Sequence, residues 1–590
     1  MTTPAPAPSQ RIQLADEQRS GSVRFGDVFL AVGVILVCFW LFLGRPYSVL
    51  SDVGYQAFSA RQYADHYTMV FNSVRLVDPR DLAKDTVTYL NAWAPAWPAL
   101  FFVAFKAGLS VGKAGRILSL LISLVGALGW LRIIALIGLK GRWRIAGILF
   151  SALYCLRVGS ITKTGAGDPI IYAVAPWLLA MALPLAISLN APWRRRLIVR
   201  TALFCLFLGG IYWLKYTGIF LSLAILGAVL IEQFRGCLRA NAVSCLVVLT
   251  IYGVAFGTPV VGLKAYNYSA SGSDFIESSA RSSPRRDTTR LLQFLSETAY
   301  NASPTLFSAD GGLEHIAGNE QSARGWLART PSFFLLLSFF YLMFRRPFTY
   351  FRNVTLLSGL IPLVLFPALS FAGGPHFSFA FARCCEPYWI LLELQLLWLL
   401  SRSPDRCISF DRNTRNVLAL ATVCQIALFL WTPFFYAKEA LKIARTPPYK
   451  ASAADLWDTD LSRYGTRDID ERVKSLIRRP EDIVVPAVYS NRAFATDTML
   501  EFGGRLLPLN IFFSPLQQTH GRDGANYNST TPFVSSTPLR VILVAPDPYK
   551  RDDFGASTER VMQRFTQVHE WVPGPLDPDR RTWIWTGEIQ

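Results

Sequence analysis

The sequence has few charged residues, and acidic residues are the scarcer kind. Asp, Glu, Lys and Arg make up only 17% of its 590 residues, and 41 Asp and Glu stand against 59 Lys and Arg. Hydrophobic residues make up 52% of the chain. Such a composition is too apolar for an ordinary soluble protein. The shortage of charge therefore indicates a multi-pass membrane protein.

Cysteine is scarce where a soluble domain could use it. None of the nine cysteines follows Cys424, and most lie inside or beside apolar runs. This excludes a disulfide framework in the C-terminal region and a Cys-x-x-Cys metal site. Zinc-finger spacing and aromatic-rich RNA-binding motifs are also missing, so the net charge of +18 does not indicate a nucleic-acid partner. The polar N-terminus lacks the pattern of a signal peptide, and residues 1–26 are expected to form a disordered cytoplasmic tail.

What the chain has instead is a series of apolar runs of about 17–24 residues, separated by short Arg-rich links. The run at 99–111 is short, carries Lys106 and follows two prolines, so we expect it to lie in the interface. Leaving it out of the count puts every basic link on one side, which the positive-inside rule assigns to the cytoplasm. The sequence then predicts an α-helical polytopic membrane protein with about eleven spans and an extracytoplasmic C-terminus. The expected spans are residues 27–43, 116–139, 145–161, 170–189, 197–213, 219–231, 241–263, 331–344, 354–372, 387–400 and 416–434.

The membrane domain is thus expected at residues 27–434, with extracytoplasmic loops at 44–115 and 264–330. Residues 435–590 are richer in charge and in Pro and Gly turns. Short β-branched or aromatic runs predict strands, and amphipathic segments predict helices. The expected strands are 482–490, 539–545 and 582–586, and the expected helices are 468–479 and 557–567. The tail therefore reads as an extracytoplasmic soluble α/β domain.

The expected extracytoplasmic turns hold an uncommon set of ionisable residues. These are Asp52 after the first span, Asp168 after the third, Lys215 after the fifth, and His376, Arg383 and Glu386 after the ninth. Ionisable groups at a membrane boundary are functional candidates, because their burial is costly. A carboxylate can take a proton from an acceptor hydroxyl, and a cation can stabilise a departing phosphate. The set therefore suits a reaction on a lipid-linked anionic substrate.

Each of these residues also has a plain structural alternative. The alternatives are a solvated loop for Asp52, a helix N-cap for Asp168, a snorkelling side chain for Lys215, an ordinary loop histidine for His376, and an ion pair across one helical turn for Arg383 and Glu386. Asn267, Asn301 and Asn528 each begin an Asn-x-Ser/Thr triplet, which would matter only in a secretory pathway.

Several short motifs occur in a fixed order along the chain. They are Asp-Val-Gly-Tyr at 52–55, Pro-Ala-Trp-Pro at 95–98, Gly-Arg-Ile-Leu at 115–118, Gly-Asp-Pro at 167–169, Leu-Lys-Tyr at 214–216 and Arg-Cys-Cys-Glu-Pro at 383–387. In order and sidedness they resemble the GT-C superfamily of integral membrane glycosyltransferases, in its protein O-mannosyltransferase and lipid A aminoarabinose transferase branch. That branch has Asp-Glu-x-x-Tyr after its first span, so Val53 stands here in place of the second acid.

The resemblance implies an inverting enzyme that moves a sugar from a polyprenyl-phosphate donor to a lipid-linked glycan or protein acceptor. Asp52 would be the general base, and Asp168 would orient the acceptor. The implied substrate-binding residues are Lys215 and Arg383 at the donor phosphate, with His376, Glu386, Arg116 and Tyr55. A divalent metal, Mg or Mn, would be held by Asp52 and Asp168, but with Val53 in place of an acid the oxygen ligands are sparse.

Two other classes remain open. A transporter or flippase of lipid-linked glycans usually carries ionisable residues at the bilayer midplane and a repeat of spans. Here the charges gather at one face and no repeat is found. A receptor or scaffold would leave the ionisable turns unexplained. The short Arg-rich links favour a bacterial inner (plasma) membrane.

Overall fold

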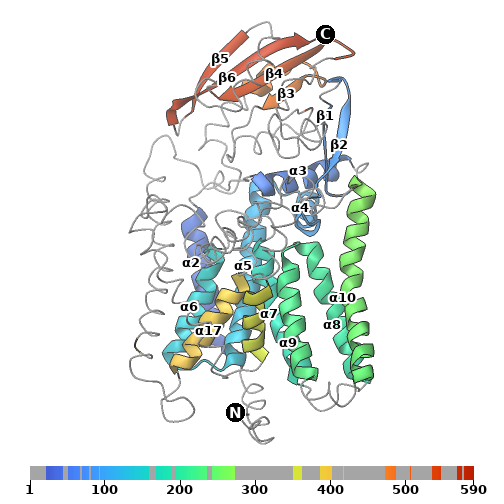
Figure 1. Ribbon diagram of the computed structural model, residues 1–590. Coiled ribbons are helices and arrows are strands. Elements are labelled where there is room, and N and C mark those ends of the chain that lie inside the picture. The colour runs from blue at the N-terminus through green and yellow to red at the C-terminus, as the bar shows by residue number, and fades with distance from the viewer. Residues whose placement is uncertain are drawn as a thin grey trace, which may run out of the picture.

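The computed structural model describes a bundle of helices with β-structure at one end (Figure 1). The described residues are 22–43, 51–66, 70–78, 81–91, 93–157, 168–187, 195–234, 242–272, 350–361, 386–401, 416, 472–486, 505, 535–546, 568–574 and 577–589. This part of the chain is mostly helical. The expected spans at 331–344 and, apart from residue 416, at 416–434 lie outside the described residues, as does the helix expected at 557–567.

Within the described residues, the bundle is built from eight helices and the helical segment 350–361. The helices are α2 (Phe25–Leu43), α5 (Val111–Ile137), α6 (Gly141–Arg157), α7 (Asp168–Ile187), α8 (Arg195–Leu214), α9 (Gly218–Phe234), α10 (Ala242–Ser271) and α17 (Glu386–Ser401). Within the described residues, four helices are long and apolar enough to cross a membrane: α5, α7, α8 and α10. The chain is therefore an integral membrane protein.

Two further helices, α3 (Ser51–His66) and α4 (Ala96–Lys106), lie at the end of the bundle far from the N-terminus (Figure 1). Because neither runs through the bundle, the helices that follow alternate in direction. The basic starts of α2, α6 and α8, with Arg24, Arg142 and Arg195, consequently lie together at the opposite end. Which end faces the cytoplasm stays a prediction of the positive-inside rule.

Several boundaries differ from the expected ones. The first loop, 44–115, contains α3, α4 and a β-hairpin, so it is a structured segment. α5 begins at Val111 instead of residue 116, and α10 continues to Ser271 instead of ending at residue 263. In both cases the helix extends beyond the apolar run, because backbone hydrogen bonds continue after the chain leaves the apolar region.

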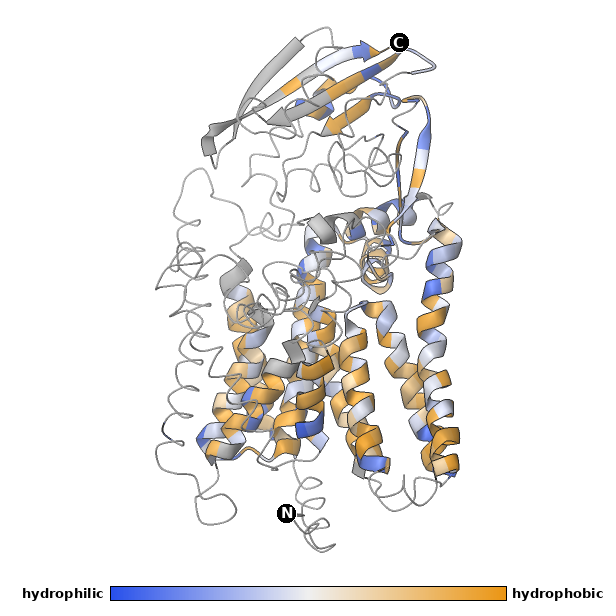
Figure 2. Ribbon diagram, in the orientation of Figure 1, coloured by the Kyte–Doolittle hydropathy of each residue, from blue (hydrophilic) through white to orange (hydrophobic). Residues whose placement is uncertain are grey.

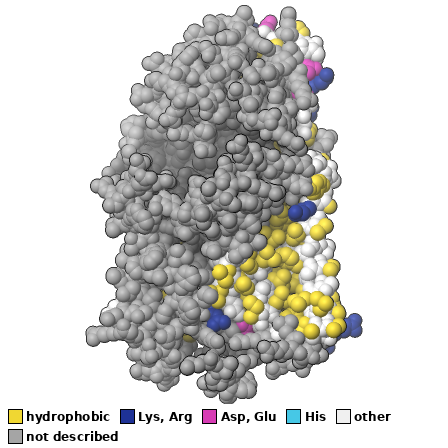
Figure 3. Space-filling model, in the orientation of Figure 1, with side chains coloured by type: hydrophobic (Ala, Val, Ile, Leu, Met, Phe, Trp, Pro, Cys, Tyr) yellow, Lys and Arg dark blue, Asp and Glu magenta, His cyan; other side chains and the backbone are white. Residues whose placement is uncertain are grey.

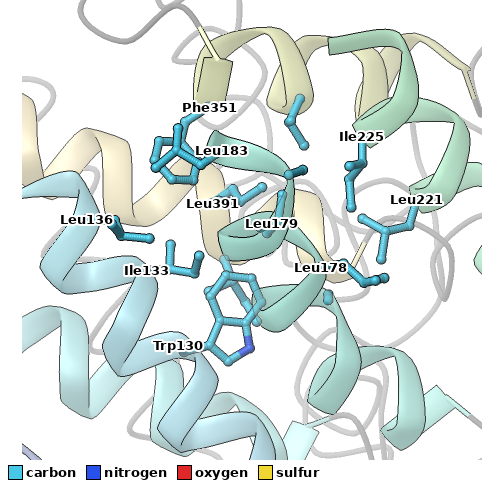
Figure 4. Packing of buried hydrophobic residues seen from close by; sticks show 14 of the residues in the cluster. Trp130, Ile133, Leu136, Leu178, Leu179, Leu183, Leu221, Ile225, Phe351 and Leu391 are labelled. Atoms are coloured by element: carbon cyan, nitrogen blue, oxygen red, sulfur yellow. The ribbon is translucent and has the colours of Figure 1, made fainter. Parts of the chain in front are cut away.

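The bundle core is centred on the packing of α5 against α7 (Figure 4). Pro176 has no N–H group, which leaves the carbonyl of Tyr172 without its helical donor. The indole Nε1 of Trp130 on α5 donates to that oxygen at 3.2 Å. Gly126 lets the helices approach, since a Cβ there would lie 2.2 Å from the Tyr172 ring. The sequence thus pairs a proline on one helix with a tryptophan and a glycine on its neighbour.

The helix α10 has an apolar face turned away from the bundle. Its exposed side chains include Val243, Leu246, Val254 and Val261. Figure 3 shows hydrophobic side chains gathered where α8 and α10 lie in Figure 1. Figure 2 shows that hydrophobic residues fill the length of the bundle helices, while hydrophilic ones lie nearer their ends. This face has the composition expected for contact with lipid tails.

The β-structure comprises a hairpin and a four-stranded sheet. Strands β1 (Ser73–Val77) and β2 (Asp85–Tyr89) pair antiparallel. The C-terminal sheet has the order β3-β4-β6-β5, with β3 parallel to β4 and the other pairs antiparallel. Its strands are β3 (Ile483–Pro486), β4 (Leu539–Pro546), β5 (Val568–Gly574) and β6 (Asp577–Ile589). The expected strands at 482–490, 539–545 and 582–586 fall on β3, β4 and β6, whereas β1, β2 and β5 were not expected. The domain boundary at 435 and the side of the membrane stay predictions.

The hairpin connects the C-terminal sheet to the end of the bundle. Arg505 donates from Nη2 to the carbonyl of Leu82 at 2.6 Å, and its Nε lies 3.2 Å from the carboxylate of Asp85. The backbone N–H of Ser536, just before β4, donates to the Asp81 carboxylate at 3.0 Å. Lys84 pairs with the same carboxylate at 2.9 Å. We call these contacts the hairpin clasp.

Acid is expected to loosen the clasp. The Ser536 N–H and the Lys84 ammonium hold the pKa of Asp81 well below its usual range. A lowered folded pKa means that the stabilisation is fully present above the unfolded pKa of about 3.9 and is lost progressively as pH falls from there through the folded pKa. At pH 7, Asp81→Asn should make the Ser536 amide exchange with deuterium about 10-fold faster.

As pH falls from about 4 towards about 2, exchange in wild type, corrected for intrinsic exchange rates, should move progressively towards that of the variant. Glu588→Gln removes an exposed carboxylate from β6 and serves as the control. Equal protection in wild type and Asp81→Asn at pH 7 would contradict the role given to Asp81.

Candidate active site

An apolar cluster holds α3 and α4 against the end of the bundle. Ala57, Ala60 and Ala64 of α3 are buried against Trp97 and Phe101 of α4. The same cluster includes Ala114 at the start of α5 and Ile170 at the start of α7, with Leu214 at the end of α8 packed against it. Small alanines on α3 let the two helices approach closely. We call this set the platform cluster, and it brings five helices to one place.

Polar contacts fix α3 from both sides. The Gln62 side chain accepts from the backbone N–H of Arg75 at 2.6 Å and donates to its carbonyl at 2.9 Å, as a strand neighbour would. The Lys106 ammonium of α4 donates to the carbonyl of Ala64 at 2.8 Å, near the end of α3 where carbonyls lack helical donors. The first turn of α3 is therefore carried on a helix that is anchored to both α4 and β1.

The structure describes the expected site residues to differing degrees. Asp52 and Tyr55 lie at the start of α3, and Asp168 is the first residue of α7, two before the clustered Ile170. Glu386 begins α17. The side chains of these four residues are outside the described part of the chain, so their placement here is that of the backbone. His376 and Arg383 lie outside the described residues entirely.

Two expected cations have described side chains, and both are buried. Arg116 lies on α5, two residues after Ala114 of the platform cluster, and is 5% exposed. Lys215 directly follows Leu214 and is 9% exposed. Cations are seldom buried this far without a compensating anion or hydrogen-bonding partner. One of these cations lies on α5 and the other on the α8–α9 turn, so this end of the bundle concentrates positive charge, which would attract an anion.

The turn that carries Lys215 is tight. The backbone N–H of Lys215 donates to the carbonyl of Ile211 at 3.1 Å, and the Lys215 carbonyl accepts from the N–H of Gly218 at 3.0 Å. A Cβ on Gly218 would lie 2.7 Å from Ile211 and 2.8 Å from Ile171 of α7. Only glycine allows this turn to press against α7, and the turn in consequence holds the Lys215 backbone beside the platform cluster.

Next to Lys215, Tyr216 takes part in a network that the sequence did not reveal. Its hydroxyl lies 2.9 Å from the carbonyl of Asn91 and 3.1 Å from Nδ2 of Asn267 on α10. The Asn267 Oδ1 accepts from the hydroxyl of Tyr89 on β2 at 2.7 Å. These residues are separated by up to 178 positions in the chain. No local pattern could have brought them together.

The same contacts exclude glycosylation at one of the Asn-x-Ser/Thr triplets. Asn267 is 0% exposed, and both polar groups of its amide are used in hydrogen bonds. An oligosaccharide could not be attached there without breaking them. Asn267 is therefore not a glycosylation site, while Asn301 and Asn528 lie outside the described residues.

Buried acids also occur away from this end. Glu393 lies near the middle of α17 and is buried, and Glu232, near the end of α9, accepts from Nδ2 of Asn353 at 2.7 Å. The expectation that charges gather at one face is therefore incomplete. Sequence position alone did not mark these two residues, because each sits inside or beside an otherwise apolar run.

The sequence predicts a divalent metal held by Asp52 and Asp168. Within the described residues, no three His, Cys, Asp or Glu side chains come together as a metal site. Asp52 and Asp168 begin helices at the same end of the bundle, but a hard divalent cation prefers six or more oxygen ligands. Two carboxylates do not complete that set, and Mg or Mn stays a prediction.

Comparisons with known proteins give matches among solved structures. No protein-family model matches the sequence, and no curated protein matches it. Among solved structures, the chain is similar to the crystal structure of ArnT from Cupriavidus metallidurans bound to undecaprenyl phosphate. The identity is 14%, the match covers 95% of this chain and 98% of that one, and the TM-score is 0.42. The ligand belongs to that protein, and the chemistry of this chain has to rest on its own residues.

Proposed function

We propose that the protein is a GT-C-type glycosyltransferase that moves a sugar from a polyprenyl-phosphate donor to a lipid-linked glycan or a protein. The observation that carries the proposal is the burial of Arg116 and Lys215 at the end of the bundle where α3 and α7 begin with Asp52 and Asp168. Buried cations beside a membrane boundary suit an anion that is attached to a lipid. The motif order around the same residues supports the same class.

The donor phosphate would bind to the cations. Lys215 and Arg116, joined by Arg383, would neutralise the phosphate and stabilise the negative charge that it gains as it departs. The polyprenyl chain would remain among the lipid tails, which the exposed apolar face of α10 already meets. His376, Glu386 and Tyr55 would complete the substrate-binding residues.

The acceptor would be activated by the acids. An acceptor hydroxyl attacks the anomeric carbon from the face opposite the phosphate, and Asp52 takes its proton as the new C–O bond forms. The old bond between the anomeric carbon and the phosphate oxygen breaks, and the polyprenyl phosphate leaves with the electron pair. One displacement of this kind inverts the anomeric configuration. Asp168 would orient the acceptor, and the reaction would take place at the extracytoplasmic face of a bacterial inner membrane.

A transporter or flippase of lipid-linked glycans is the second candidate. Glu393, buried near the middle of α17, favours it, because transporters place ionisable residues deep in the membrane. The buried cations beside the platform cluster would then be an entry site. A transferase and a flippase differ in whether a new glycosidic bond appears, and that product distinguishes them.

Binding of the donor is the first test. Purified protein should bind a polyprenyl-phosphate sugar saturably, and Lys215→Ala combined with Arg383→Ala should weaken binding about 100-fold or more, since each charged hydrogen bond contributes roughly 1.5–3 kcal/mol. Lys113→Ala is the matched control, because Lys113 is exposed on α5 one turn from Arg116.

If the double variant loses donor binding while Lys113→Ala binds normally, the result supports a polyprenyl-phosphate sugar as the donor class. A folded wild-type protein that binds no polyprenyl-phosphate sugar would overturn the proposed function. Binding followed by movement of the intact lipid across a vesicle, with no new glycosidic bond, would select the flippase.

A further inference from the structure

We propose that Tyr216 is a positioning residue, which Asn267 and the β1–β2 hairpin hold so that Lys215 points its ammonium at the donor phosphate. The proposal rests on the proposed function for the identity of the phosphate. It adds two residues, Tyr216 and Asn267, that act on the reaction through Lys215 without touching substrate.

The hydrogen bonds of the network have one consistent direction. The Tyr89 hydroxyl donates to Asn267 Oδ1 at 2.7 Å, and Asn267 Nδ2 donates to the Tyr216 oxygen at 3.1 Å. The Tyr216 hydroxyl is then left to donate, and it does so to the carbonyl of Asn91 at 2.9 Å. In the Asn267 amide Oδ1 can only accept and Nδ2 can only donate, so the direction of each hydrogen bond in the network is fixed. These hydrogen bonds therefore fix the hydroxyl end of the Tyr216 ring, and we call them the Tyr216 lock.

Three segments far apart in sequence meet at this lock. They are the α8–α9 turn with Tyr216, the segment after β2 with Asn91, and the last turns of α10 with Asn267. Burial raises the cost of breaking such bonds, since a freed buried group finds no water in exchange. The buried Asn267 is thus a rigid joint between α10 and the turn.

Aromatic contacts hold the same region. The Tyr216 ring lies 5.0 Å from that of Tyr212, one turn earlier on α8. On the other side, Tyr266 of α10 lies 5.8 Å from Tyr89, and its hydroxyl donates to the carbonyl of Phe71 at 3.0 Å. The ring at position 216 would therefore keep its place if only its hydroxyl were removed. That separates the effect of the hydrogen bond from the effect of packing.

The lock acts on Lys215 through the backbone. A lysine side chain has four rotatable bonds, so the position of its ammonium depends on how its Cα and its surroundings are fixed. The turn fixes that Cα through Ile211 and Gly218, and the Tyr216 lock fixes the next residue. Ordering the cation before the donor arrives lowers the entropy lost on binding. Losing the lock should therefore weaken donor binding more than it weakens the fold.

The experiment uses Tyr216→Phe and Asn267→Ala in the full-length protein, with two readouts. The first is acylation of Lys215 by an amine reagent, followed by mass spectrometry, with the exposed Lys113 as internal reference. The second is the KM for a polyprenyl-phosphate sugar against kcat. Both variants should label Lys215 about 10-fold faster and raise that KM about 10-fold, with kcat changed less than about 3-fold. Tyr268→Phe makes the same substitution at an exposed residue of α10 and should match wild type in both.

Lys215 labelling and the kinetic readout together distinguish a failure of this inference from a failure of the proposed function. Unchanged labelling of Lys215 in both variants, with only a lower Tm, would overturn the inference and leave the network with a structural role. Faster labelling in a protein whose wild type binds no polyprenyl phosphate would overturn the proposed function while leaving the hold on Lys215 intact. A fall in kcat without a change in KM would also contradict positioning for the donor.

Discussion

Replacing Asp52 by Asn should lower sugar transfer about 10²- to 10⁴-fold, the range that a general base contributes. The amide has nearly the shape of the carboxylate but cannot take the proton of an acceptor hydroxyl. Asp52 lies at the start of α3, which the platform cluster and Gln62 hold in place without it. Folding, membrane insertion and donor binding should therefore be preserved. Transfer is measured with a fixed donor and acceptor, beside the donor Kd.

The matched control is Asp65→Asn, which makes the same change at the other end of α3. Asp65 forms an exposed ion pair with Arg61 at 3.2 Å, and such pairs contribute little to stability. Its transfer rate should equal that of wild type. If Asp52→Asn transferred sugar at the wild-type rate, the assignment of Asp52 as general base would be wrong. If it lost donor binding as well, Asp52 would belong to the donor side.

The pattern of the sequence predicted the helices well but not where they end. Apolar length identifies a span, and the expected runs at 170–189 and 197–213 match α7 and α8 to within two residues, whereas α6 begins four residues before the expected run at 145–161. The ends of α5 and α10 lie beyond their apolar runs, because a helix continues as long as its backbone bonds are made. Lys264, which marked the expected end of an apolar run, is inside α10.

The hairpin could not be predicted for a different reason. β1 and β2 have five residues each, and β2 is exposed at Asp85 and Val87. Two short strands alone are marginal in water. What stabilises these two is tertiary: Gln62 of α3 bonds to β1, and Arg505 bonds to the turn and to β2. Because those partners are remote in sequence, no local sequence pattern could have predicted the hairpin.

For the candidate site, the sequence identified charges but not the residues that hold them. Lys215 was expected from its type and from the topology, Arg116 was expected from the family resemblance, and both are buried at the same end. Tyr216 and Asn267 carry no charge, and their roles depend on a contact across 51 positions. The hairpin bonds to Tyr216 and Asn267 at one end and to the C-terminal sheet at the other. One short element thus connects the clasp to the turn that carries Lys215.

The packing of α8 against α10 leads to the largest expected loss of stability. A Cβ on Gly209 would lie 2.1 Å from the carbonyl oxygen of Phe256 and 3.2 Å from Pro259. A backbone oxygen cannot rotate aside as a side chain can, so the two helices would have to separate. Trp213, one turn on, donates to the Pro259 carbonyl at 2.8 Å and would lose that bond. Small residues are what allow membrane helices to associate closely.

Gly209→Ala should therefore destabilise the protein by about 3 kcal/mol, the upper range for overpacking, and lower the Tm by several degrees. Gly210→Ala is the matched control, because nothing lies within 4 Å of a Cβ there. It should leave the Tm unchanged or raise it, since alanine favours a helix over glycine by about 1 kcal/mol. Separation of α8 from α10 also pulls Asn267 away from Tyr216, so Gly209→Ala should label Lys215 faster and bind donor more weakly. Equal Tm values for the two alanine variants would show that α8 and α10 do not pack at Gly209, and would remove the anchor on which the Tyr216 lock depends.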